Sequence, residues 1–193
     1  ARFHGNGVLT PLSFVADSLS YRFPDGEPAI TDVSFTASGG QLIGVLGANG
    51  TGKTTLLNLL SGLLIPGSGD IRVNGVSLIR NNDELAGVIG FVPQDDLLIE
   101  ELSVFDNLFY AATLSLPDKT KEELISVVNR MLSSLGLYDK KELRVGSPLY
   151  KKISGGERKR LNIALELIRE PAVLFVDEPT SGLSSRDSVN VMD

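Results

Sequence analysis

Residues 47–54 read GANGTGKT, and this stretch decides how the chain should fold. It fits the pattern G-x-x-x-x-G-K-[ST], which is typical of a phosphate-binding P-loop. The apolar run at 42–46 before it has strand character, and leucines at helical spacing follow it over 55–64. A glycine-rich turn between a strand and a helix is the context that such a loop requires. The stretch therefore predicts a site for the phosphates of a nucleotide.

The residue types in this loop suit that task. Glycines let successive backbone N–H groups turn toward phosphate oxygens, and the positive end of the following helix faces the same anion. Lys53 can reach the β- and γ-phosphates, and the Thr54 hydroxyl can ligate Mg²⁺. The residues expected to bind the nucleotide here are Gly47, Asn49, Gly50, Thr51, Gly52, Lys53, Thr54 and Thr55.

Composition narrows the possible classes of protein. The 193 residues suit one medium domain or part of a larger one, and a net charge of −6 argues against a surface that coats nucleic acid. The absence of cysteine excludes disulfides and thiolate metal sites. No apolar run is long enough to span a bilayer, and the first residues do not form a signal peptide.

The chain divides into an α/β core and a helical insertion. Alternating apolar and polar residues predict strands at 12–23, 30–37, 70–73 and 88–92, and helical spacing predicts helices at 104–116, 121–135 and 157–169. The continuous apolar run 172–176 predicts a strand buried on both faces of a parallel sheet. The expected parts are a flexible arm at 1–10, a nucleotide-binding core at 11–96 and 171–193, and a helical subdomain at 97–170.

Two further motifs carry chemistry. In 173–178, VLFVDE, the apolar strand ends in two acids, so Asp177 is placed to hold Mg²⁺ and Glu178 to polarise an attacking water. In 153–157, ISGGE, Ser154 can cap a helix whose N-terminus forms a second anion site. One nucleotide cannot easily use both helix starts within a single monomer.

With these motifs, residues 12–193 resemble the nucleotide-binding domain of an ATP-binding-cassette (ABC) transporter. The stretches 92–96 (VPQDD), 153–160 (ISGGERKR) and 177–183 (DEPTSGL) look most like the G-subfamily (White-type) exporters and their bacterial relatives. Ile153 and Glu157 stand where Leu and Gln are commoner in the family's signature motif. The resemblance implies an ABC-type ATPase core with an antiparallel β subdomain and a helical insertion.

The resemblance also implies a composite site. Two such domains pair head to tail, and each ATP lies between one P-loop and the other domain's signature. The signature residues implied to contact the partner's ATP are Ser154, Gly155, Gly156 and Glu157. The residues implied to act in catalysis are Glu178, Gln94 and Lys53, and those implied to hold Mg²⁺ are Thr54, Gln94 and Asp177. Phe23 falls where the family has an aromatic that stacks on adenine, with Tyr21 as the alternative.

The implied function is that of an ATP-binding and hydrolysing subunit that couples dimerisation to transport, with export as the expected direction. Its partners would be a second such domain and a transmembrane domain, at the cytoplasmic face of the cell membrane, and not nucleic acid. The basic run within 157–160 is interpreted as a solvated helix turn rather than a nucleic-acid contact. The alternative is a soluble, non-transport ABC ATPase of the translation or chromosome-maintenance type.

Two departures from the family pattern qualify this resemblance. Ser184 stands where the D-loop (181–184) usually has Asp, at the implied dimer interface. The family's switch histidine belongs one strand beyond the point where the sequence stops, and His4 is too far away in the chain to replace it. We therefore expect a C-terminally truncated domain, with an unpaired sheet edge and weak or no ATP hydrolysis of its own.

Overall fold

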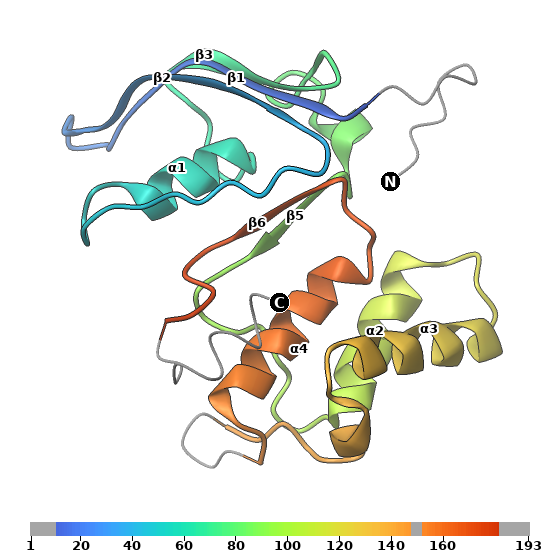
Figure 1. Cartoon of the computed structure of the whole chain (residues 1–193). Helices are drawn as coiled ribbons and strands as arrows, with labels where there is room; N and C mark the ends of the chain where they lie inside the picture. Colours follow the sequence, from blue (N-terminus) through green and yellow to red (C-terminus); the bar gives the residue numbers. More distant parts are fainter. Residues whose placement is uncertain (1–10, 148–151, 182–193) are drawn as a thin grey trace. The chain divides into compact units, whose positions relative to one another are not determined.

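The computed structural model describes residues 11–147 and 152–181, and it confirms the α/β architecture (Figure 1). The chain forms two compact units. Of the described residues, the first unit holds 11–89 and Ala172–Phe175, and the second holds 90–147, 152–171 and 176–181. Strands β5 (Ile89–Val92) and β6 (Val173–Val176) pair with each other, and the chain passes from one unit to the other within each of them.

An antiparallel sheet forms most of the first unit. Its strands are β1 (Ser13–Arg22), β2 (Pro28–Ser38), β3 (Ser68–Val73) and β4 (Val76–Ser77), in the spatial order β2-β1-β3-β4. Alternation along these strands places one set of side chains in a core with helix α1 (Lys53–Leu60), as period-2 patterning predicts. The buried members of this core are Phe14, Ala16, Leu19, Leu60, Ile71, Val73, Leu78 and Leu85. The strands expected at 12–23, 30–37 and 70–73 are thereby confirmed.

The turn between β3 and β4 follows from two residues. Asn74 and Gly75 both have positive φ, 50° and 83°, which a two-residue hairpin turn requires and which these residue types tolerate. The Asn74 side chain also accepts a hydrogen bond from the Ser13 N–H at 2.7 Å, so it attaches the turn to the start of β1.

The segment before the P-loop is not the strand that its apolar sequence suggests. Residues 41–48 have no regular structure, and the Leu42 and Leu46 side chains are 89% and 95% exposed. A strand is completed by hydrogen bonds to a neighbouring strand, and among the described residues no strand pairs with this segment. A cavity of about 320 Å³ lies beside it, with Val45 and Phe175 among its apolar lining residues. The expectation of a strand at 42–46 is therefore wrong.

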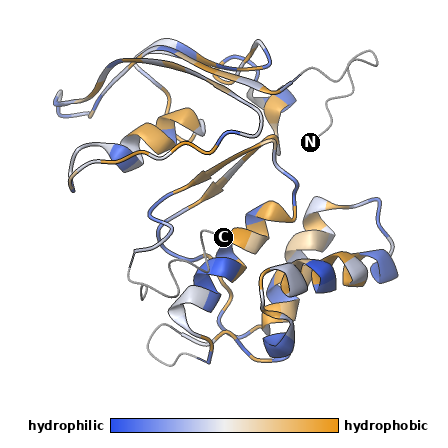
Figure 2. Ribbon diagram, in the orientation of Figure 1, coloured by the Kyte–Doolittle hydropathy of each residue, from blue (hydrophilic) through white to orange (hydrophobic). Residues whose placement is uncertain are grey.

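Three helices build the second unit: α2 (Val104–Ser115), α3 (Lys121–Ser134) and α4 (Gly155–Leu167). All three expected helices are confirmed, although α4 begins two residues earlier than predicted. Their apolar faces meet in one core, and Figure 2 shows α4 changing from hydrophilic in its first turns to hydrophobic in its last. The buried apolar residues that these helices and the residue after α4 contribute are Val104, Leu108, Ala112, Leu124, Val128, Leu132, Leu161, Ala164 and Ile168. No helix within the described ranges is long and apolar enough to cross a membrane.

Local signals set the ends of α3. Thr120 is the N-cap, and its side chain accepts from the Glu123 N–H while the Glu123 carboxylate accepts from the Thr120 N–H. This reciprocal pair is a capping box, which satisfies two backbone donors that the helix leaves free. Gly136 follows the helix at φ 65°, as expected for a residue that ends a helix.

Strand β6 is only half-buried, not buried on both faces as its apolar sequence predicts. The Ala172 and Val173 N–H groups donate to the Val88 carbonyl, and the Asp177 N–H donates to the Val92 carbonyl at 2.9 Å. Both registers advance in the same direction, so β5 and β6 run parallel. Within the described part of the chain β5 is the one strand beside β6, which explains the remaining exposure. Two shorter 3-10 helices, Asn82–Leu85 and Tyr138–Lys140, complete the described elements.

Candidate functional site

The P-loop lies in the first unit, and its last two residues form the start of α1 (Lys53–Leu60). Gly50 and Gly52 have φ of 79° and 87°, values that residues other than glycine rarely adopt. A Cβ on Gly47 would lie 2.7 Å from the Thr51 hydroxyl oxygen, so this position also excludes larger residues. The Thr51 hydroxyl donates to the Ala48 carbonyl at 2.8 Å and closes the loop on itself. The loop is thus shaped by glycines, as the motif predicts.

Lys53 folds back over this loop. Its ammonium donates to the carbonyls of Gly47 at 3.0 Å and Ala48 at 2.9 Å. These contacts hold a positive charge against the exposed loop, and Lys53 itself is half-buried. An incoming phosphate offers the ammonium stronger, charge-assisted hydrogen bonds than carbonyls do. The position of Lys53 is therefore compatible with phosphate binding.

The start of α1 supplies the second half of an anion site. Its N-cap is Gly52, in the left-handed conformation, and no side chain caps the first turn. The first backbone N–H groups of a helix lack partners within the helix, and the helix dipole makes this end positive. Thr54, the candidate metal ligand, is exposed in that first turn, and Thr55 beside it is half-buried. A polyphosphate chain therefore fits this site, which combines a glycine-rich loop, the Lys53 ammonium and the uncapped N-terminus of α1.

The two aromatic candidates for adenine stacking also belong to the first unit. Phe23 is 43% exposed and Tyr21 is half-buried, at the end of β1. Their rings meet edge to face, with centroids 5.7 Å apart and an angle of 84° between the planes. An exposed ring held in position by a neighbouring ring is suited to stacking on a base. The structure leaves both residues as candidates, with Phe23 the more accessible.

The paired acids follow β6 in the second unit. Asp177 is 4% exposed, and its N–H is held by the Val92 carbonyl. Glu178 is half-buried and has a φ of 43°, which is unusual for a residue with a long side chain. Left-handed backbone at such residues costs free energy and is concentrated at functional sites. This conformation turns the chain sharply after β6, and the Ser181 N–H donates to the Glu178 carbonyl at 3.2 Å.

The signature segment forms the first turn of α4. The Ser154 hydroxyl accepts from the Glu157 N–H at 3.2 Å, and the Glu157 carboxylate accepts from the Ser154 N–H at 2.7 Å, which is a second capping box. Glu157 also pairs with the Lys140 ammonium at 2.5 Å. Burial alone raises the pKa of Glu157, but the hydrogen bonds from Lys140 and Ser154 outweigh it and hold that pKa below its usual value. Ser154 is exposed and Gly155 half-buried, whereas Gly156 is buried.

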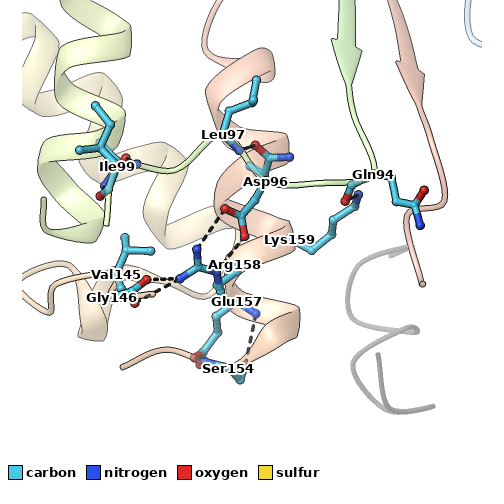
Figure 3. A network of polar contacts seen from close by, with 12 residues as sticks. Gln94, Asp96, Leu97, Ile99, Val145, Gly146, Ser154, Glu157, Arg158 and Lys159 are labelled. Carbon is cyan, nitrogen blue, oxygen red and sulfur yellow. Dashed lines mark hydrogen bonds and ion pairs between the residues drawn. The ribbon is translucent and has the colours of Figure 1, made fainter. Parts of the chain in front are cut away.

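The charged run that follows corrects an expectation. Arg158 and Lys159 are buried, at 4% and 8% exposure, so the interpretation of this turn as solvated is wrong. The Arg158 guanidinium binds both carboxylate oxygens of Asp96 at 2.8 and 3.0 Å and donates to the carbonyls of Val145 and Gly146 (Figure 3). These charges are buried because each of them has a partner, as buried ions require.

Lys159 draws together two of the expected motifs. Its ammonium donates to the carbonyls of Pro93 at 3.0 Å, Gln94 at 3.4 Å and Asp177 at 3.3 Å. Burial lowers the pKa of Lys159 and outweighs the opposing effect of nearby carboxylates, of which Asp177 is the strongest. The Gln94 side chain itself is exposed. Sequence reasoning missed Lys159 because a lysine early in a helix is usually exposed; the two acids at 95–96 were the available signal.

The expected site residues thus fall into two groups. The P-loop, Phe23 and Tyr21 belong to the first unit, and Gln94, the paired acids and the signature belong to the second. The metal ligands expected at 54, 94 and 177 come from both units, and the described residues include no cluster of three or more His, Cys, Asp or Glu able to hold a metal. Gly182, Leu183 and Ser184 of the D-loop and His4 lie outside the described residues.

Comparisons with known proteins identify the family to which the chain belongs. A family profile described as "ABC transporter" matches residues 30–181. A "Probable ATP-dependent permease" of Saccharomyces cerevisiae is 39% identical over 195 residues, which cover 96% of this chain and 18% of the permease. ABC transporter G family member 23 of Arabidopsis thaliana is 40% identical over 200 residues, covering 99% of this chain and 32% of that protein. The chain therefore spans a third or less of the length of these two relatives.

A solved structure has the same fold. The chain matches cbiO1 from Clostridium perfringens, part of the ABC transporter complex cbiONQ, with a TM-score of 0.81 and 29% sequence identity, over 93% of this chain and 70% of that one. The family match covers the P-loop, the signature and the paired acids in one stretch. The chain therefore belongs to the ABC transporter family and forms an ATPase domain of that family.

Proposed function

We propose that the chain binds ATP and that, as a domain of a complete transporter, it hydrolyses ATP to power transport across a membrane, whereas the chain by itself hydrolyses ATP weakly or not at all. The observation that carries this proposal is the P-loop, where a glycine cradle, the Lys53 ammonium and the uncapped start of α1 converge on one anion site. The relatives are named as a permease and as ABC transporters, which favours transport over a soluble ABC ATPase. The related exporter subfamily supports export as the direction.

The chain's own residues would divide the work. Lys53 and the backbone of 47–55 bind the phosphates, and Phe23 or Tyr21 stacks on the base. Thr54, Gln94 and Asp177 would hold Mg²⁺, which when bound neutralises phosphate charge as the terminal phosphate departs. Glu178 orients the attacking water and accepts its proton.

The signature at the start of α4 would act on a second copy's nucleotide. Ser154 and Gly155 are accessible at a helix N-terminus, where backbone donors and the helix dipole favour an anion. We propose a head-to-tail pair of such domains, each closing over the other's ATP, on the cytoplasmic face of a membrane and in contact with a transmembrane domain. The pairing explains two anion sites in one chain.

Binding of a fluorescent ATP analogue tests this proposal. The unsubstituted chain should bind it, and Lys53→Met should weaken binding by about 10- to 100-fold, because hydrogen bonds to charged groups contribute roughly 1.5–3 kcal/mol. Lys121→Met removes an exposed lysine from the first turn of α3 and serves as the matched control. Absence of binding by the unsubstituted chain, or equal binding by the two variants, would contradict the proposal.

A second measurement separates binding from hydrolysis. In the complete transporter, Glu178→Gln should stop phosphate release while the analogue still binds, because the amide keeps its shape but no longer accepts the proton. A variant that hydrolyses ATP at the unsubstituted rate would show that another group activates the water.

A further inference from the structure

Lys159 is a buried cation whose contacts the proposed mechanism does not use. It lies in the second turn of α4 and donates to three carbonyl oxygens, those of Pro93, Gln94 and Asp177. An ammonium has three N–H donors, so these contacts use its whole capacity. A charge buried to 8% exposure persists only where it is fully partnered, and here the partners are backbone groups of two candidate site segments.

These carbonyls lie just beyond the parallel pair of strands. The last bond of the β5–β6 ladder joins the Asp177 N–H to the Val92 carbonyl at 2.9 Å. Past this bond the two segments separate from the ladder, one continuing to Gln94 and the other to Glu178. The Lys159 ammonium contacts both segments at this point, so it joins them where the hydrogen bonds of the ladder end (Figure 3 shows Lys159 beside Gln94).

Charge supports the same placement. The acids that affect Lys159 are Asp95, Asp96, Asp177 and Glu178, which lie on both of these segments. Asp96 is already bound by Arg158, whereas among residues 11–147 and 152–181 Lys159 has no carboxylate partner at hydrogen-bond distance. The ammonium therefore stabilises the backbone of these segments while its charge offsets several acids together.

The backbone at Glu178 needs such support. Its φ of 43° is a strained conformation for a glutamate, and strain of this kind persists only where surrounding contacts impose it. The Asp177 carbonyl belongs to the peptide bond that precedes Glu178, and Lys159 holds that carbonyl directly. The position of the Glu178 side chain thus depends on a contact from α4.

We propose that Lys159 is a positioning residue that fixes the Gln94 and Asp177–Glu178 segments to each other and to the signature helix. The consequence rests on the proposed function: the helix that meets the second copy's nucleotide at Ser154 also sets the metal-binding geometry of its own copy. Closure over one nucleotide would in this way be transmitted to the other site through one side chain.

The test compares Lys159→Met with Arg160→Met, a control on the same helix whose guanidinium donates to the Leu135 carbonyl instead. Hydrogen–deuterium exchange of the metal-free chain is measured on peptides covering 93–97 and 174–181. Lys159→Met should speed exchange there by about tenfold or more, since a charge-assisted hydrogen bond is lost. Arg160→Met should leave both peptides unchanged, and Lys159→Arg, which keeps the donors, should restore protection. Equal exchange in Lys159→Met and Arg160→Met overturns the proposal.

A binding measurement adds the functional arm. Mg²⁺ should increase the affinity of the unsubstituted chain for the fluorescent ATP analogue, and Lys159→Met should reduce this increase by about 10- to 100-fold, as loss of support behind metal ligands typically does. Affinity without Mg²⁺ should stay unchanged, because the P-loop is intact. An undiminished Mg²⁺ effect overturns the proposal.

If Lys159→Met does not fold, Lys159→Gln replaces it. We expect a partial effect of Lys159→Gln on exchange and on the Mg²⁺ dependence, and no effect overturns the proposal. Failure of the unsubstituted chain to bind would instead refute the proposed function, while the exchange measurement still decides the role of Lys159.

Discussion

Replacing Arg158 by methionine should destabilise the chain far more than an ordinary ion-pair deletion. The Arg158 side chain is 5% exposed, and that of its partner Asp96 is 24% exposed. The substitution removes two bonds to that carboxylate and two to the carbonyls of Val145 and Gly146. Removing one member of a buried pair costs about 3–5 kcal/mol, because the other charge stays behind without compensation. Since Asp96 keeps some access to water, we expect the lower end, about 3 kcal/mol.

The matched control is Arg72→Met. Arg72 binds Asp70 at 2.9 Å, nearly the distance of the Arg158 pair, but the Arg72 side chain is 43% exposed. Exposed pairs contribute about 0–1 kcal/mol, and Asp70 keeps hydrogen bonds from the Ser77 hydroxyl and the Ile71 N–H. Because the two ion-pair distances are nearly equal, the difference between the variants reports the burial of the Arg158 pair together with the additional bonds that Arg158 makes.

Urea unfolding followed by circular dichroism measures both variants against the unsubstituted chain. Asp96→Asn combined with Arg158→Met completes a double-mutant cycle, and the double variant should lose less stability than the two single losses added together. If Arg158→Met costs no more than about 1 kcal/mol beyond Arg72→Met, the burial argument is refuted.

Further predictions concern Glu157, the α2 cap and the P-loop. Because the pKa of Glu157 is lower in the folded chain than its unfolded value of 4.5, the ionised carboxylate stabilises the fold above pH 4.5, and this stability is lost as the pH falls through the folded pKa. In a plot of the urea midpoint against pH, Glu157→Gln should therefore show a smaller decrease at acid pH than the unsubstituted chain. An equal decrease in the two proteins would contradict this. Ser103→Ala removes the acceptor of the Asp106 N–H at the start of α2 and should lower the free energy of unfolding by about 1 kcal/mol in the urea assay, whereas no loss would argue against the cap. Gly47→Ala places a Cβ 2.7 Å from the Thr51 hydroxyl oxygen and should weaken ATP-analogue binding, while adding Thr51→Ala should restore part of it; failure of this rescue would exclude the clash as the cause.

Elements with strong local signals could be predicted well. The hairpin at 74–75, the capping box of α3 and the P-loop at 47–54 each depend on residues a few positions apart, and their geometry follows from residue type. For these features the sequence was sufficient, because the interactions that form them are local.

Two regions could not be predicted in this way. The apolar run at 42–46 has the composition of a strand, but a strand also needs a neighbour, and composition does not say whether one lies beside it. The charges of Glu157, Arg158 and Lys159 look solvated in sequence because their partners are distant along the chain. Lys140 is 17 positions from Glu157, Asp96 is 62 from Arg158, and Pro93 is 66 from Lys159.

The residue order alone predicts the P-loop and the capped start of α4, since glycine spacing and capping residues act within a few residues. The ABC ATPase domain follows from the resemblance that these motifs carry. Folding decides what the charges after that helix start do. Because the fold places Asp96, Pro93 and Asp177 beside α4, the charged residues at 157–159 are buried and paired and do not form a solvated turn. Contacts between residues far apart in the sequence form only when the chain folds, so no local sequence pattern predicts them.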